Sequence, residues 1–494
     1  MSEEIEPGRA PRITRREALK TIGYGTVTVA IAACGGNTGG RQAGVNTPES
    51  LETQAPPVSA QSTGGIPTRP PAVGKKTQLV YWDSITEGSP GIEKLIKNFN
   101  QKHKDIQVVR QVQTTQQSRD VIRTALDAGQ GPDVFQYDTG PGFAGVLARA
   151  GLLQPLEDAY KKYGWDKRFL PIAKQRTTFQ GVPYGIGHQL EVVGVFYNKR
   201  IFDDLGLQEP KTHDELLQIC EKIKGQGGIY PIAFGDKDKW PAGHTFSVFA
   251  GNIAGREKLA KAISAETPWD DPDFVKAINI PFVEMNKKGY WPPTVNAISY
   301  DDWQAVFYSG KAAMSLTGTW MIGSYSPRPA PTPAAGEEGD EEEQLTMQDP
   351  VGFFFYPSVD GKQIAPPSGL GIGYFVNKKA KNPEAAYQFL DYLFSEEAAP
   401  VWIEDLDQIP PIEVDASKLK VSDLMRQTLD SLQKGGDTMG YNIDVLTPEN
   451  FNTVMFDGFQ TVLAGKKTAE QQAKDLQAAM KQAKQAGKTF DITQ

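Results

Sequence analysis

Residues 129–138 read GQGPDVFQYD, a turn followed by a short apolar strand that ends at an acid. Gly129 stops a preceding helix, whose apolar positions over residues 121–126 recur at helical spacing. The strand covers residues 133–137, and Asp138 stands at its carboxyl end. A helix that leads into a strand in this way is typical of βαβ units with parallel strands. This stretch therefore predicts an α/β fold.

The same alternation extends to both sides of this stretch. Before it, strands are expected at 78–82 and 106–112, with an amphipathic helix between them that buries Ile92, Leu95, Ile96 and Phe99. After it, the pattern restarts, and capping residues mark helices that begin near residues 212, 382 and 468. These strands are expected in a largely parallel sheet, and a chain of 494 residues exceeds one ordinary domain, so we expect two. The later strands are expected at 193–198, 230–235, 312–316 and 351–356.

The N-terminal residues carry the features of an export signal. Arg15 and Arg16 stand in a segment that resembles the twin-arginine motif, and a mildly apolar run over 21–33 follows. This run is shorter than the roughly 20 residues that span a membrane. Residues 31–34 read IAAC and resemble a lipobox, in which Cys34 would be lipidated. We expect a twin-arginine-type lipoprotein signal peptide at 1–33; the alternative is a frayed helix around an incidental cysteine.

Composition sets further limits. Residues 34–76 are rich in Gly, Pro, Ser and Thr, so we expect a disordered tether there. The formal net charge of −8 argues against a nucleic-acid partner. The second of the two cysteines, Cys220, lies in an amphipathic segment and is expected to be an inert core thiol. Residues 326–349 form an acidic, proline-rich insertion that we expect to be a solvated surface loop.

From residue 77 to about 490 the chain resembles the periplasmic-type solute-binding proteins of ABC importers, in the maltose- and oligosaccharide-binding group known as extracellular solute-binding protein family 1. Each matching piece is weak alone, but their order and spacing are specific. The pieces are GQGPDV (129–134), GVPY (181–184), VFYNKRIF (195–202), PKTHDEL (210–216), YPIA (230–233), GKAAM (310–314), GTW (318–320) and GLGIG (369–373).

The resemblance implies a two-lobed periplasmic-binding-protein fold of type II, with the ligand cleft between the lobes. It places lobe one at 77–188 plus 373–407, and lobe two at 189–372 plus 408–494. The chain would then cross between the lobes near residues 185–188 and 369–373. Both stretches contain glycines, which tolerate large changes of φ and ψ, so they are candidate hinges.

Ligands of open α/β sheets sit beyond the carboxyl ends of the strands, and this selects the candidate site residues. A sugar needs flat rings to stack on its C–H faces and Asp, Glu, Gln or Asn for its hydroxyls. The candidate ligand-binding residues are Asp83, Ser84, Glu87, Gln116, Gln117, Asp138, His188, Glu191, Trp240, Trp320 and Ser368.

Several of these residues also have a structural interpretation. Asp83 and Asp138 could cap the following helices, and Trp240 could brace its own loop. Trp82 and Trp303 are expected in the core. The spacing of His188 and Glu191 invites a metal, but two ligands do not make a site, so no metal is expected.

We therefore expect a binding protein rather than an enzyme, monomeric and without a cofactor. It would capture a carbohydrate, which we expect to be an oligosaccharide, by hinge closure and deliver it to an ABC permease. Its expected place is outside the cytoplasm, lipid-anchored to the outer face of the cytoplasmic membrane. The open alternatives are an exported glycosidase, which needs two carboxylates with different pKa values, and the same fold binding a polyamine or a phosphorylated polyol.

Overall fold

The computed structural model describes residues 66–71, 74–84, 89–326, 347–414, 419–435 and 439–489. The predicted signal peptide, Cys34, Glu87 and residues 327–346 of the acidic insertion lie outside these ranges. Within them, no helix combines the length and the apolar character needed to cross a membrane.

The first sheet has five strands in the order β2-β1-β3-β12-β6. β1 runs parallel to both β2 and β3, whereas β12 runs antiparallel to its neighbours β3 and β6. The strands are β1 (Thr77–Asp83), β2 (Ile106–Val112), β3 (Val134–Asp138), β6 (Gly185–His188) and β12 (Ile372–Val376).

The second sheet has six strands. Five of them follow the order β13-β11-β7-β9-β8, and β10 pairs with β7. Two short strands, β4 (Thr178–Phe179) and β5 (Val182–Pro183), form a separate hairpin. The strands of the second sheet are β7 (Glu191–Asn198), β8 (Tyr230–Ala233), β9 (Ala312–Gly318), β10 (Val351–Phe354), β11 (Pro367–Gly369) and β13 (Gly440–Tyr441).

The prediction of a largely parallel sheet is confirmed in part: β1 is parallel to β2 and β3 in the first sheet, and β8 to β9 and β11 to β13 in the second. β12 returns to the first sheet from the second and therefore enters it in the opposite direction. In the second sheet, β7 is antiparallel to β9, β10 and β11. Both sheets are therefore mixed.

Alternate residues of β1 enter different cores, as the two-residue period of a strand requires. Leu79 and Tyr81 pack in a cluster with Phe99, while Val80 and Trp82 pack with Leu126 in a second cluster. The first sheet is thus covered by apolar side chains on both faces. Its helices are α2 (Ser89–Lys102), α3 (Thr115–Asp127), α4 (Ala144–Arg149), α5 (Glu157–Lys162), α6 (Trp165–Arg168), α7 (Pro171–Gln175), α15 (Pro383–Leu393) and the π-helix η4 (Val401–Asp405).

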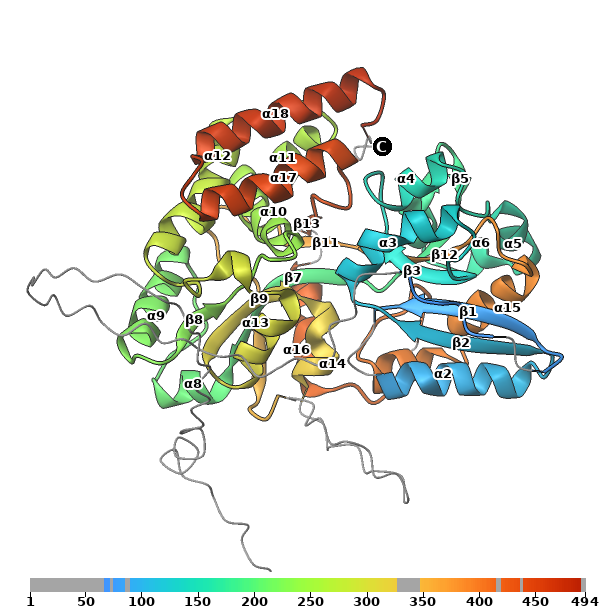
Figure 1. Ribbon diagram of the computed structural model, residues 1–494. Helices are drawn as coiled ribbons and strands as arrows, with labels where there is room; N and C mark the ends of the chain where they lie inside the picture. Colours follow the sequence, from blue (N-terminus) through green and yellow to red (C-terminus); the bar gives the residue numbers. More distant parts are fainter. Residues whose placement is uncertain are drawn as a thin grey trace, which may run out of the picture. The chain divides into compact units, whose positions relative to one another are not determined.

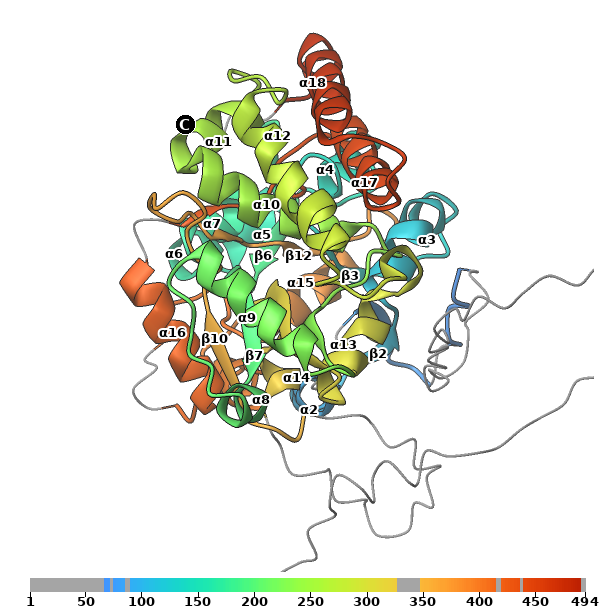
Figure 2. The same ribbon diagram turned by 90° about the vertical axis from the view of Figure 1, so that its left-hand side faces the viewer.

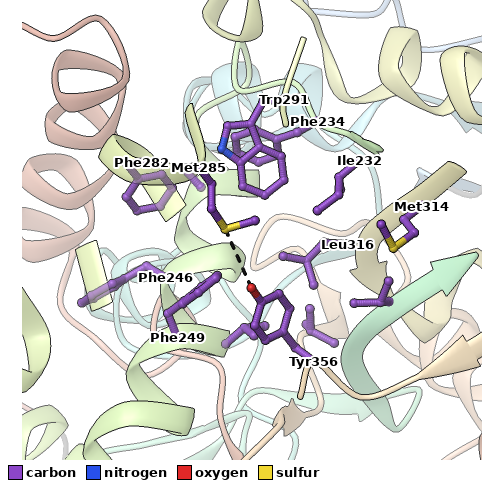
Figure 3. Close-up of a cluster of buried hydrophobic side chains, with 14 of the residues drawn as sticks. Ile232, Phe234, Phe246, Phe249, Phe282, Met285, Trp291, Met314, Leu316 and Tyr356 are labelled. Atoms are coloured by element: carbon purple, nitrogen blue, oxygen red, sulfur yellow. Dashed lines mark hydrogen bonds between the residues drawn. The ribbon is translucent and has the colours of Figure 1, made fainter. Parts of the chain in front are cut away.

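The second sheet shares one large core with its own helices. Part of this core is shown in Figure 3, where the Tyr356 hydroxyl faces the Met285 sulfur at 3.8 Å. Cys220 is fully buried in the same core, which confirms its prediction as a core thiol. Burial raises the pKa of this thiol.

Helices flank the second sheet along most of its chain. α17 and α18 lie side by side in both views (Figures 1 and 2). The α-helices are α8 (Lys199–Asp204), α9 (His213–Gly225), α10 (Trp240–Ala254), α11 (Arg256–Ile263), α12 (Pro272–Asn279), α13 (Tyr300–Tyr308), α14 (Ile322–Tyr325), α16 (Asp423–Gly435), α17 (Glu449–Leu463) and α18 (Ala469–Gln485). Three shorter helices are the π-helix η1 (Ile280–Met285) and the 3-10 helices η2 (Val295–Ala297) and η3 (Thr319–Met321).

Two chain segments cross side by side between the sheets. His188 is paired with Ile372 in the first sheet, and Glu191 is paired with Gly369 in the second. The strand pairing of these two segments is interrupted only at residues 189–190 and 370–371. Gln189 has a φ of 60°, so the backbone leaves the extended region at this point.

The glycines of the first candidate hinge have another role. Gly185 and Gly187 lie inside β6, and a Cβ on Gly185 would meet the Phe375 ring at 2.6 Å. Gly185 is thus needed for close packing, and the interruption of the ladder lies one residue beyond the predicted stretch. The second candidate hinge, 369–373, contains the interruption at 370–371.

The ends of the predicted segments also differ in detail. Residues 66–71 fall in the predicted tether, yet the Arg69 guanidinium pairs with Asp133 and donates to the Gly131 carbonyl at 3.2 Å. At the other end, Ile412 packs in the same apolar cluster as Phe99 and forms an isolated β-bridge with Phe169. It lies beyond residue 407, the predicted end of lobe one. The ion pair and hydrogen bond of Arg69 decide the first boundary, and the apolar packing of Ile412 decides the second.

Candidate functional site

A pocket of about 300 Å³ is lined by residues that follow strands of both sheets. This volume is at the lower end of the range for small-molecule sites. From the first sheet come the end of β3 with Asp138 and the start of α3; from the second come the starts of α10 and α13, the helix η3 and the loop after β13. The two crossing segments contribute Gln189, Glu191 and Gly371.

Aromatic rings form one part of the pocket wall. The Trp240 ring centroid lies 4.4 Å from that of Tyr300, 4.9 Å from that of His244 and 6.3 Å from that of Trp320. Trp320 Nε1 donates to the Tyr300 hydroxyl at 2.6 Å, and this hydroxyl lies 2.9 Å from Thr317 Oγ1. The indole polar edge is therefore occupied, which leaves ring surface for an apolar face of a ligand.

A bidentate ion pair stands on the side of the first sheet. Arg119 Nε lies 2.9 Å from Asp138 Oδ2, and Arg119 Nη2 lies 2.5 Å from Asp138 Oδ1. Both side chains are largely buried. Burial alone would lower the pKa of Arg119, but the Asp138 carboxylate outweighs it and raises the pKa above the usual range. The pair is thus charged and fixes Asp138 at the carboxyl end of β3.

Two further carboxyl groups, Glu191 and Asp444, have pKa values shifted in opposite directions. Burial, and then the nearby charges of Asp138 and Asp444, raise the pKa of Glu191 well above its usual range, although its hydrogen bond from Gly371 N at 3.1 Å acts in the opposite sense. Burial would also raise the pKa of Asp444, but His244 and Arg119 outweigh it and lower this pKa. The pocket therefore holds one acid with a raised pKa and one with a lowered pKa.

Six of the eleven predicted residues line this pocket, which brings them together from both sheets. Ser84 is fixed there by Gln136, whose Oε1 accepts from both Ser84 N at 3.1 Å and Ser84 Oγ at 2.9 Å. That these residues contact a ligand remains a prediction. The six are Ser84, Gln116, Asp138, Glu191, Trp240 and Trp320.

Four predicted residues do not line the pocket: Asp83, Gln117, Ser368 and His188. Asp83 makes a bidentate pair with Arg110, with two contacts of 2.8 Å. Gln117 closes the capping box of α3 with Thr114. Ser368 Oγ donates to the Gly440 carbonyl inside the second sheet. The fifth remaining candidate, Glu87, lies outside the described residues.

His188 is fully buried behind the pocket rather than on its wall. Its Nε2 lies 3.1 Å from Gln408 Oε1, and its ring centroid lies 4.4 Å from that of Trp402. Burial lowers the pKa of His188 to about 4. Gln408 and the strand partner of His188, Ile372, both line the pocket, so His188 contacts the site through its neighbours.

The sequence did not single out several residues that line the pocket. Arg119 lies within a helix that was recognised only by its apolar face. Asn442 and Asp444 follow β13, which has two residues and therefore no readable alternation. Tyr300 and His244 are the first and fifth residues of their helices, positions that a search of strand ends does not reach. Trp82 and Trp303 are confirmed as core residues.

Comparison with known proteins identifies the family of the chain. Residues 82–400 match the family model described as bacterial extracellular solute-binding protein. The chain belongs to this family. Bacterial extracellular solute-binding proteins are transport binding proteins rather than enzymes, and their location is outside the cytoplasm, as we expected from the sequence.

Individual relatives are distant. An uncharacterized ABC transporter extracellular-binding protein of Pyrococcus horikoshii is 27% identical over 366 residues, which cover 71% of this chain and 75% of that protein. A maltotriose-binding protein of Pyrococcus abyssi is 30% identical over 205 residues, 41% of each chain. The solved structure of a chitin oligosaccharide binding protein matches with a TM-score of 0.71 at 23% identity, over 83% of this chain and 99% of that one. The solved structures confirm the two-lobed type II fold.

Proposed function

We propose that this protein is a carbohydrate receptor of an ABC import system, which captures an oligosaccharide in the pocket and delivers it to a membrane permease. The observation that carries the proposal is the combination of aromatic rings and hydrogen-bonding acids around one pocket. Trp240 and Trp320 offer ring faces, while Asp138 and Glu191 offer oxygens to hydroxyls. Relatives whose names specify maltotriose or multiple sugars support the same ligand class.

The mechanism that we propose is closure about the two crossing segments. Lobe one, about 77–188 plus 373–407, would carry Asp138, and lobe two, about 189–372 plus 408–494, would carry Trp240 and Trp320. A ligand that contacts both groups stabilises the closed form, because it binds that form better than the open one. The permease would then distinguish loaded from empty receptor by this shape.

The proposal includes attachment to the membrane. Residues 31–34 read IAAC after a twin-arginine-like segment, so we place a lipid on Cys34. Residues up to about 65 would then be the tether, because Arg69 already contacts the first sheet. Labelling of cells with a radioactive fatty acid tests this: wild type should be labelled, and Cys34→Ala should not.

A thermal-shift screen with mono-, di- and trisaccharides tests the ligand class, because a ligand that binds only the folded state raises the melting temperature. We expect oligosaccharides to raise it and Trp320→Ala to lose most of that response. Ligands should be confirmed by titration calorimetry. A set of sugars that gives no shift in the wild type would contradict the proposal.

Hydrolysis is the second candidate, and one observation favours it. The pKa of Glu191 is raised and that of Asp444 is lowered in the same pocket, and glycosidases use such a difference between two carboxyl groups. Chromatography of the sugars recovered from the same screen separates the two functions. A receptor returns the sugar unchanged, whereas shortened products that disappear in Glu191→Gln would establish the enzyme.

A further inference from the structure

The pocket carries more acid than the binding of neutral hydroxyls requires. Among the described residues that line it, five are carboxylic acids, one is an arginine and one is a histidine. Neutral sugars need acceptors, which amides supply equally well. The excess of acids therefore bears on which sugars the site accepts. The acids are Asp138, Glu191, Asp238, Asp301 and Asp444.

Two of these acids are already compensated. Asp138 shares both oxygens with Arg119, so this pair has no net charge. Glu191 is buried beside the crossing segments, where its Oε2 accepts from Gly371 N at 3.1 Å and burial raises its pKa. Both groups thus already have partners within the protein.

Asp444 is different, because one of its oxygens lacks a donor. Its side chain is 1% exposed, and Oδ1 accepts from Val445 N at 2.9 Å. Oδ2 is buried and has no hydrogen bond within the described part of the chain; His244 Nε2 lies 3.6 Å away. His244 Nδ1 is likewise buried without a hydrogen-bond partner there. A buried ionised oxygen without a donor is costly, which points to a donor supplied by the ligand.

The surroundings of Asp444 also favour a positive charge. His244 stands between the two indoles, with ring centroids 4.9 Å from Trp240 and 5.3 Å from Trp320. Faces of indole rings attract cations through their quadrupole. Asp238 precedes Trp240 by two residues and accepts from Tyr300 N at 2.7 Å, so a further carboxylate stands beside the rings.

We propose that the oligosaccharide captured here carries a protonated amino group, and that the ammonium donates to Asp444 Oδ2 beside the ring faces of Trp240 and Trp320. The inference rests on the proposed function and narrows it to amino sugars.

Titration calorimetry with matched sugars tests the inference. β-1,4-linked glucosamine di- and trisaccharides would be compared with their N-acetylated forms and with the corresponding glucose oligomers, and the set repeated with galactosamine and galactose sugars. We expect the free amines to bind about tenfold or more tightly than their neutral partners, because a hydrogen bond between charged groups is stronger than one between neutral groups. The preference should fall as salt is raised.

Asp444→Asn removes the charge while an amide oxygen can still accept from Val445 N, so urea unfolding should find it folded. We expect its preference for the amine to fall to within about twofold. Asp475→Asn makes the same charge change on an exposed residue of α18 and should retain the preference. An Asp444→Asn protein that keeps the tenfold preference overturns the role of Asp444.

The failures of the two proposals can be told apart. Equal binding of neutral sugars and amines overturns the inference and leaves the carbohydrate receptor standing. Binding of spermidine without any sugar overturns both, and so does the absence of any bound sugar. Tighter binding of amines that Asp444→Asn abolishes establishes both.

Discussion

Arg119 and Trp240 meet across the pocket, with the guanidinium carbon of Arg119 5.9 Å from the centroid of a Trp240 ring. Arg119 lies on α3 beside the first sheet, and Trp240 begins α10 beside the second. The same guanidinium lies 4.9 Å from the Phe143 ring. The two halves of the site thus touch directly, so a ligand that contacts one of them is already close to the other.

Trp320→Ala should weaken sugar binding by about tenfold or more, because stacking of a sugar on an indole buries apolar surface of both. The protein should remain folded, since Tyr300 keeps its contact with Thr317. Titration calorimetry measures the affinity and urea unfolding the stability. Affinity within about twofold of wild type would remove Trp320 from the site.

Asp138→Asn should lower the free energy of unfolding by about 3 kcal/mol, because it leaves the buried charge of Arg119 without its partner. The double variant Arg119→Met/Asp138→Asn should recover much of this loss, since no unpaired charge remains. Urea unfolding of wild type, both single variants and the double variant measures the coupling. Additive effects of the two substitutions would contradict the pairing.

Gly140→Ala should disturb the contact between the loop after β3 and the loop after β13, because a Cβ at Gly140 would lie 1.8 Å from the Val445 carbonyl oxygen. Gly151→Ala is the matched control: this glycine also has a positive φ, but no atom lies within 4 Å of its Cβ position. Both substitutions should lower the free energy of unfolding by about 1 kcal/mol because of backbone strain. Gly140→Ala should lose more unfolding free energy than Gly151→Ala and should bind sugar more weakly. Equal losses of unfolding free energy in urea would show that the contact between Gly140 and Val445 is unimportant.

His188 should make the protein sensitive to mild acid. Its folded-state pKa of about 4 lies below the value of about 6.5 expected in the unfolded chain. The unfolded state therefore takes up the proton first, and stability that is fully present above pH 6.5 is lost as the pH falls toward 4. This loss is at most about 3 kcal/mol. His188→Gln should lack it, so the difference in unfolding free energy between wild type and variant should shrink over this range; a constant difference would refute the prediction.

The sequence predicted the parts of the fold and site that depend on periodicity. Strand ends of β1 and β3 could be located because apolar residues stop there, and this brought Ser84 and Asp138 into the candidate site. Asp83 and Asp138 are alike in sequence, each an acid at a strand end, and each is paired with an arginine. Only Asp138 lines the pocket, and no local pattern distinguishes the two.

Other features depend on contacts between distant segments. Asp444 lies in a loop after the two-residue strand β13, and its importance follows only from what surrounds it. The roles of Gly185 and Gly187 were misread for the same reason. Glycine serves both flexibility and close packing, and only the position of the Phe375 ring shows which applies at Gly185.

The paired crossing segments have a mechanical consequence. Residues 188–191 and 369–372 run antiparallel beside one another, and Gly371 N donates to Glu191 Oε2 across them. Torsion in one of these segments would therefore strain its hydrogen bond to the other. We expect these segments, together with the third passage of the chain between η4 and α16, to limit how the two sheets can move relative to one another, so that a single bound molecule could hold them in one arrangement.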